Sequence, residues 1–214
     1  MKKLLAVIVV VLMGVAALAQ SDSFAYFLNE VRGDLTLWFP GGDKFDLYES
    51  TGTGLEVQYR NWAFDPLGLG LSLGYAIWTA NSDSTDISAP DMSDFDGDLT
   101  LIPVGGSLLY KVADWADWNL TVEAGVRYVI TQSDIDFLRT LPDTAYRVDL
   151  DIDSAWVGLI GGDFERLWNE SWSLFLGGGY QTDITHGRTE VDNGHLRDNE
   201  LQAWFLRAGA KYAF

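Results

Sequence analysis

Six charged residues recur at alternate positions inside three otherwise apolar segments of the chain. They are Glu56 and Arg60, Glu123 and Arg127, and Arg207 and Lys211. Every second side chain of a β-strand points to the same face, so each pair would lie on the less apolar face of its strand. Glu123 and Arg127 stand about 13 Å apart at ~3.4 Å per residue, too far to pair with each other. Their partners must come from other strands.

A buried charge without a partner costs several kcal/mol. We therefore predict a network across the inside of a barrel, in which Glu56 and Glu123 meet Arg60, Arg127, Arg207 or Lys211. Such a network could act as a gate or polar conduit, or it could be a plug that fills the barrel. The interior of an eight-stranded barrel is just wide enough for side chains to fill, which favours the plug.

Two further groups of residues could do chemistry. Asp94, Asp96 and Asp98 alternate near the end of an acidic segment, and hard cations favour carboxylate oxygens. The spacing does not match an EF-hand loop, and acidic runs are commonly solvated, so we expect no metal there. His186 and His195 fall in a predicted external loop, where a histidine with a serine and a carboxylate could transfer acyl groups. Polar surface is the simpler interpretation, and we expect neither an enzyme nor a cofactor.

Strand alternation is clearest over residues 67–79, where leucines alternate with glycine, serine and alanine. In a soluble barrel the leucines would face inward and a row of glycines would face water, with no gain in packing. In a membrane barrel the leucines face lipid and the glycines let the walls approach each other. This segment therefore favours a membrane-spanning barrel.

The same alternation predicts eight strands. They fall near Gly33–Phe39, Thr53–Trp62, Leu67–Thr79, Asp98–Val112, Asn119–Thr131, Asp149–Phe164, Trp172–Ile184 and Glu200–Phe214. In the sixth, either Ala155, Val157 and Leu159 point outward, or Trp156 and Ile160 do. The connections alternate between short and long, as periplasmic turns and external loops do, and an even strand number puts both termini in the periplasm.

Tryptophan and other aromatic residues gather near the predicted strand ends, as in the girdles of membrane barrels. The inner girdle would contain Trp62, Phe64, Trp115, Trp118, Trp168, Trp172, Tyr212 and Phe214, and the outer one Trp38, Phe39, Trp78 and Tyr180.

The N-terminus predicts export. Lys2 and Lys3 precede an apolar run, and small residues end at Ala19, which is typical of a cleaved signal peptide over residues 1–19. Residues 20–214 would form the barrel domain. Without the two lysines, 12 basic residues stand against 31 acidic ones, a formal charge of -19 that disfavours nucleic acid as a partner. The chain has no cysteine, so no disulfide supports it.

The last strand ends in the apolar series Leu206, Ala208, Ala210, Tyr212 and Phe214. This ending resembles the assembly signal of bacterial outer-membrane β-barrels. Together with the alternation and loop lengths, it makes the mature chain resemble the small eight-stranded barrels of the OmpA, OmpX and OmpW types. The resemblance implies an all-β fold, an eight-stranded antiparallel up-and-down transmembrane β-barrel in the cell outer membrane. It also implies a monomer whose partners are outer-membrane lipids, lipopolysaccharide and, through the last strand, the barrel-assembly machinery.

Proteins of these types range from structural and adhesive proteins to conduits and lipid-modifying enzymes, so fold alone does not choose among them. We expect a structural or surface-interaction role through acidic external loops. The alternatives are a narrow OmpW-like conduit for small or apolar molecules, a lipid-modifying enzyme, and a periplasmic lipocalin-like barrel.

Overall fold

The computed structural model describes residues 29–40, 51–80, 92–115, 117–141, 144–185, 187–191, 194–199 and 201–214. The predicted signal peptide and the first residues of the predicted barrel domain lie outside these ranges. The regular elements are β-strands: β1 Asn29–Pro40, β2 Gly52–Phe64, β3 Leu67–Thr79, β4 Met92–Trp115, β5 Trp118–Leu141, β6 Thr144–Ile152, β7 Ala155–Leu167, β8 Trp172–Asp183, β9 Gly187–Val191, β10 Gly194–Asn199 and β11 Ala203–Ala213. In this described part, no helix is long and apolar enough to cross a membrane.

Eight of these strands close into an antiparallel barrel. The order runs β5, β4, β3, β2, β1, β11, β8, β7, and an antiparallel pairing of β7 with β5 completes the circle. The first and last strands are neighbours, with Leu35 opposite Ala208. The predicted all-β, eight-stranded antiparallel barrel is confirmed.

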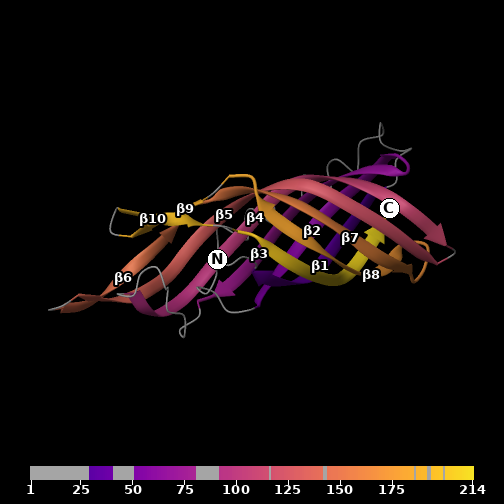
Figure 1. Cartoon of the computed structure of the whole chain (residues 1–214). Coiled ribbons are helices and arrows are strands. Elements are labelled where there is room, and N and C mark those ends of the chain that lie inside the picture. Colours follow the sequence, from indigo (N-terminus) through magenta and orange to yellow (C-terminus); the bar gives the residue numbers. More distant parts are fainter. Residues whose placement is uncertain are drawn as a thin grey trace.

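The remaining three strands extend the sheet beyond one end of the barrel. The outer part of β5 leaves the closed barrel and pairs with β6, which pairs with β9, which pairs with β10. Figure 1 shows β6, β9 and β10 together beyond the end of the barrel that lies opposite the C-terminus. We call β6, β9, β10 and the adjoining outer parts of β4 and β5 the external sheet.

Three predicted strand bounds were wrong because of this extension. β4 and β5 each contain 24 residues and run well past Asp98 and Thr131, where the polar sequence had suggested loops. The predicted strand Asp149–Phe164 is in fact two strands, β6 and β7, which meet at Asp153 and Ser154. The eight strands were predicted from an alternation that gives one lipid-facing apolar side, and the aspartates of these outer segments hid that they are strands as well.

The outward face of the barrel is apolar. Leu35, Leu71 and Leu108 each expose at least 59% of their surface, while their strand neighbours are buried. A protein in water would not leave such a continuous band of leucine, valine and isoleucine exposed. The hydrocarbon of a bilayer is the environment that suits it.

Aromatic side chains mark both ends of this band. At the turn end, Phe64, Trp115, Trp118, Trp168, Trp172, Tyr212 and Phe214 are exposed. At the other end, Trp156 packs against Tyr128 and Trp204 against Tyr180, with ring centroids 5.1 Å and 4.9 Å apart.

Three tryptophans were wrongly assigned to these girdles. Trp38, Trp62 and Trp78 are 5%, 4% and 1% exposed and point into the barrel. Trp38 shares its face with Asp34 and Thr36, because side chains alternate along β1. Nearness to a strand end had suggested the girdle, whereas the alternation decides the face.

The inside of the barrel has two layers. Toward the external end it is filled by an apolar cluster: Trp38, Ala76, Trp78, Ala80, Leu99, Leu101, Val129, Ile135, Ile152, Ala155, Val157, Leu201, Ala203 and Phe205. Toward the periplasmic turns the inward residues of the same strands become charged. Along β11, for example, Phe205 is followed by Arg207 and then Lys211 on the same face.

Candidate functional site

The charged layer takes its side chains from five strands. The sequence left open which side chains of β7 point outward. In the structure, Trp156 and Ile160 point outward and are 47% and 64% exposed, whereas Ala155, Val157 and Leu159 point inward. The same alternation sends Asp163 and Glu165 into the barrel, where they are 1% and 3% exposed.

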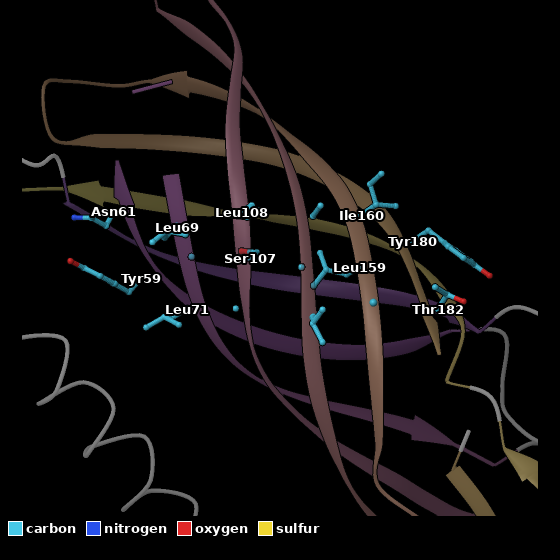
Figure 2. Close-up of a pocket in the computed structure, with 16 residues that line it drawn as sticks. Tyr59, Asn61, Leu69, Leu71, Ser107, Leu108, Leu159, Ile160, Tyr180 and Thr182 are labelled. Atoms are coloured by element: carbon cyan, nitrogen blue, oxygen red, sulfur yellow. The ribbon is translucent and has the colours of Figure 1, made fainter. Parts of the chain in front are cut away.

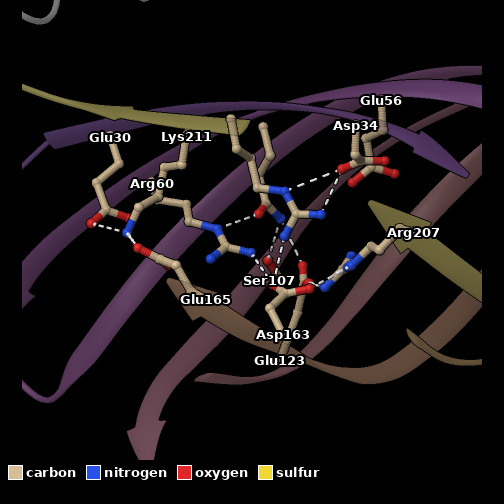
Figure 3. A network of polar contacts seen from close by, with 12 residues as sticks. Glu30, Asp34, Glu56, Arg60, Ser107, Glu123, Asp163, Glu165, Arg207 and Lys211 are labelled. Atoms are coloured by element: carbon tan, nitrogen blue, oxygen red, sulfur yellow. Dashed lines mark hydrogen bonds and ion pairs between the residues drawn. The ribbon is translucent and has the colours of Figure 1, made fainter. Parts of the chain in front are cut away.

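Asp163 is the centre of the layer and accepts hydrogen bonds from three arginines. Its Oδ2 lies 2.6 Å from Nη1 of Arg32 and 2.7 Å from Nη2 of Arg60, and its Oδ1 lies 2.8 Å from Nε of Arg207. These arginines come from β1, β2 and β11, so one carboxylate joins four strands (Figure 3). Charge-assisted hydrogen bonds of this kind are roughly twice as strong as neutral ones.

Glu123 extends the network to β5. Its Oε2 accepts from Nη2 of Arg207 at 2.6 Å, and its Oε1 accepts from the Gln58 amide at 2.7 Å. Gln58 in turn accepts from Nε of Arg60 at 2.6 Å. Another pair, Arg127 with Glu56, joins β5 to β2 at 2.8 Å.

Asp34 and Lys211 complete the layer at its two ends. Asp34 accepts from Nη2 of Arg32 at 2.6 Å. Nearer the periplasmic turns, Nζ of Lys211 lies 2.8 Å from Glu30 and 2.6 Å from Glu165. Lys211 thus links β11 to β1 and β7, with both carboxylates visible beside it in Figure 3.

These side chains are almost completely buried inside the barrel. Arg32 and Arg60 are 1% exposed, and Glu123, Arg127 and Arg207 are 2% exposed. Water therefore hardly reaches them from either end. We call these paired residues the lumen charge network: Glu30, Arg32, Asp34, Glu56, Gln58, Arg60, Glu123, Arg127, Asp163, Glu165, Arg207 and Lys211.

All six charged residues singled out in the sequence lie in this network. Glu56 pairs with Arg127 and Glu123 with Arg207, whereas Arg60 and Lys211 find their partners among residues that the sequence analysis missed. Glu30 and Arg32 precede the predicted start of the first strand. Asp34 lies inside that strand, on the face opposite Leu35 and Leu37, and this alternation could have identified it.

Glycines make room for the network. A Cβ atom on Gly177 would lie 2.1 Å from Oδ1 of Asp163, so the carboxylate lies directly over the backbone of β8. A Cβ on Gly209 would come within 2.9 Å of the Asp34 side chain. Inward glycines are therefore required where a neighbouring strand sends in a large charged side chain.

The external sheet carries a second group of charged residues. Asp96 of β4, Asp136 of β5 and Asp149 of β6 lie opposite one another in register, and Asp98 lies opposite Asp134. Asp134, Asp136, Asp149 and Asp151 line a hollow of about 380 Å³. Arg147 forms an ion pair with Asp136, and the Thr79 hydroxyl donates to Asp98 at 2.9 Å. We call Asp96, Asp98, Asp134, Asp136, Asp149 and Asp151 the acidic rows.

The other candidate residues are only partly described. Among the described residues, no group of three or more histidines and carboxylates could hold a metal ion, Asp96 and Asp98 included. The side chain of Asp94 lies outside the described part. So do His186 and the side chain of His195, and the enzyme alternative that rests on them remains a prediction.

The C-terminal residues lie as the alternation requires. Leu206 and Tyr212 are 53% and 40% exposed on the outward face of β11, and Ala208 shares that face. Phe214 directly follows β11 and is 45% exposed. Ala210, also on the outward face, lies opposite Gly33 of β1. Tyr212 packs on Trp172 with ring centroids 5.0 Å apart.

A shallow apolar hollow crosses the outside of the barrel. Leu71, Leu108 and Ile160 border it in Figure 2, and each of them is more than half exposed. Because these side chains belong to the lipid-facing surface, the hollow is not a passage through the lumen.

No protein-family model matches the chain, and no curated protein sequence matches it. Several solved structures share its fold. The outer membrane protein OprG from Pseudomonas aeruginosa aligns with a TM-score of 0.58 and 14% identity, over 87% of this chain and 95% of OprG. A major outer membrane protein from Thermus thermophilus gives 0.53 and 18%, over 87% and 99% of the two chains. Neisserial surface protein A (NspA) gives 0.50 and 13%, over 88% and 97%.

The identities are low, and the likeness is one of fold. It agrees with the closed barrel described above. The outer-membrane location predicted from the sequence is also the location named for OprG and the Thermus protein. The protein is therefore a small eight-stranded β-barrel of the bacterial outer-membrane type.

Proposed function

We propose that the protein is a closed outer-membrane barrel that acts at the cell surface, where the acidic rows of its external sheet bind positively charged partners. The observation that carries this proposal is the register of the external sheet. Asp96, Asp136 and Asp149 lie side by side on three neighbouring strands, although like charges directly opposite each other destabilise a sheet. Arg147 of β6 pairs with Asp136 and offsets part of that repulsion, and a cationic partner would relieve the rest.

The buried state of the lumen supports a role outside the barrel. A conduit needs a route for its solute, whereas the described charges of the lumen network are between 1% and 6% exposed. The apolar cluster above them adds a second filled layer. Both layers favour a structural plug over the OmpW-like conduit.

Calorimetric titration with poly-lysine tests the proposal on protein refolded in detergent. We expect binding that weakens as salt is raised, because exposed charges are screened. The double variant Asp134→Asn, Asp149→Asn should bind about tenfold more weakly, since two exposed pairs at up to ~1 kcal/mol each exceed the ~1.4 kcal/mol of one decade.

A matched control removes two exposed carboxylates at the periplasmic end, by Asp65→Asn and Asp114→Asn. This variant has the same net charge as the first and should bind poly-lysine as the wild type does. If both double variants lose the same affinity, the acidic rows are not a binding surface and only the overall charge of the protein attracts the peptide.

A further inference from the structure

Arg166 occupies an unusual position on the lipid-facing surface. In the described part of the eight barrel strands, leaving aside the external sheet, the outward positions carry apolar or uncharged polar residues, and Arg166 of β7 is the charged exception. Its side chain is exposed, and it follows Phe164 on the outward face. A charge on the lipid face costs about 2–4 kcal/mol at the bilayer midplane and nearly nothing at the interface.

Arg166 lies at the interface. It is opposite Trp118 on β5 and Leu174 on β8, so it belongs to the aromatic girdle at the turn end of the barrel. Its guanidinium lies 5.2 Å from the centre of the Trp118 ring, which itself stacks on Phe164 at 4.6 Å. Girdle residues lie at the level of the lipid headgroups. The guanidinium is thus at the depth of the phosphates.

Two carboxylates lie near Arg166, on the side of the girdle that faces the water. The Leu167 amide donates to the Asp117 carbonyl at 2.8 Å, which ties the β4–β5 turn to the end of β7. Arg166, Asp117, Glu170 and Trp168 then line one hollow of about 660 Å³. The hollow has a cation next to the lipid, two carboxylates beyond it, and apolar walls from Trp168 and Leu174.

We propose that this hollow binds the headgroup of an aminophospholipid in the periplasmic leaflet. Arg166 donates hydrogen bonds to the phosphate in a geometry that a guanidinium suits. Asp117 and Glu170 accept from the primary ammonium, and the acyl chains lie along Leu174 and the apolar band. This inference goes beyond the proposed surface function and rests only on the placement of the barrel in a bilayer.

The charges in the hollow select among phospholipids. A phosphatidylglycerol headgroup offers the phosphate without a cation, and a phosphatidylcholine headgroup offers a cation that has no N–H to donate. Phosphatidylethanolamine offers a phosphate for Arg166 and a primary ammonium for Asp117 and Glu170. We therefore expect it to bind more tightly than the other two.

Native mass spectrometry of the refolded full chain tests the site, with an equimolar mixture of the three lipids carrying identical acyl chains. The wild type should retain phosphatidylethanolamine preferentially. Arg166→Gln should lower the retention of all three lipids about fivefold, the effect of ~1 kcal/mol for one basic residue at a membrane surface. Asp117→Asn with Glu170→Gln should reduce the retention of phosphatidylethanolamine to that of phosphatidylglycerol.

Arg147→Gln is the control, because Arg147 lies in the external sheet and its loss also removes one positive charge. Heat-dependent mobility in gel electrophoresis verifies that each variant has folded. The conservative variant Arg166→Lys keeps the positive charge and should retain part of the lipid binding. Equal retention of the three lipids by the wild type would overturn the aminophospholipid assignment. Unchanged binding by Arg166→Gln would overturn the site itself. Displacement of the lipid by millimolar inorganic phosphate would overturn the lipid assignment, because the site would then recognise phosphate alone.

Discussion

Asp163 holds three of the four arginines of the lumen charge network, so its charge should decide whether this layer is stable. Asp163→Asn keeps the shape of the side chain and removes the charge that faces Arg32, Arg60 and Arg207. We expect a loss of about 3–5 kcal/mol in the free energy of unfolding, the usual cost of leaving a buried charge without its partner. Urea unfolding of the protein in lipid vesicles measures this loss.

Asp65→Asn is the matched control. Asp65 pairs with Lys111 at 3.0 Å, but its side chain is 70% exposed. Exposed pairs contribute about 0–1 kcal/mol, so this variant should unfold almost as the wild type does. Equal destabilisation by the two substitutions would mean that the buried position of Asp163 has no special weight.

A substitution at Gly177 tests how tightly the lumen charge network packs against β8. Gly177→Ala would push a methyl group against the Asp163 carboxylate, and we expect a destabilisation of about 1–3 kcal/mol from overpacking. Gly33→Ala serves as control, because a Cβ there meets nothing within 4 Å. The same urea series compares them, and a Gly177→Ala barrel as stable as the Gly33→Ala one would contradict the tight packing described.

At the scale of elements, β11 has two faces with separate tasks. Its inward residues Arg207 and Lys211 belong to the lumen charge network, while Phe214 and Tyr212 lie on the outward, girdle side. Deleting Phe214 should lower the amount of folded protein in the outer membrane of cells and leave refolding in detergent nearly unchanged. The physical reason is that the deletion removes only two backbone hydrogen bonds to Asn29 and one ring contact with Tyr212 at the end of the sheet, whereas an assembly signal must be read by another protein.

Arg207→Gln provides the opposite case. It should reach the membrane normally and lose stability in urea, because Glu123 and Asp163 lose their partner. Immunoblots of membrane fractions, read beside refolding yields, separate the two effects. If both changes impair the same quantity, the division of β11 into two faces is wrong.

Elements in lipid were predictable from the sequence, and those outside it were not. The alternation of leucine and glycine locates β3 to the residue, because one face must be apolar and the other small. The outer parts of β4 and β5, the first part of β6, and all of β9 and β10 lie beyond the lipid-facing band. Their aspartates suggested loops, although Ile135 and Ile152 join the apolar cluster. Within the site, Asp163 was hidden by a strand whose two faces are both apolar at Ala155–Ile160, and Glu165 lies beyond the predicted end of that strand at Phe164.

At the scale of the whole molecule, the barrel joins a filled lumen to an acidic sheet outside the membrane. The charge network and the apolar cluster close the lumen in two layers, and nothing in the described residues of either layer is more than 9% exposed. Chemistry and recognition are therefore expected on the outside of the barrel, at the external sheet and at the lipid interface. The pairing of β7 with β5 closes the barrel without help from that sheet.

Planar-bilayer recording of the refolded wild-type protein tests this closed-barrel account most directly. We predict no steady ionic current above that of the bare bilayer, because buried ion pairs and a packed apolar layer leave ions no route. Asp163→Asn, which breaks the centre of the charged layer, should at most add brief openings. A stable open channel in the wild type, with a conductance that Asp163→Asn leaves unchanged, would contradict the account.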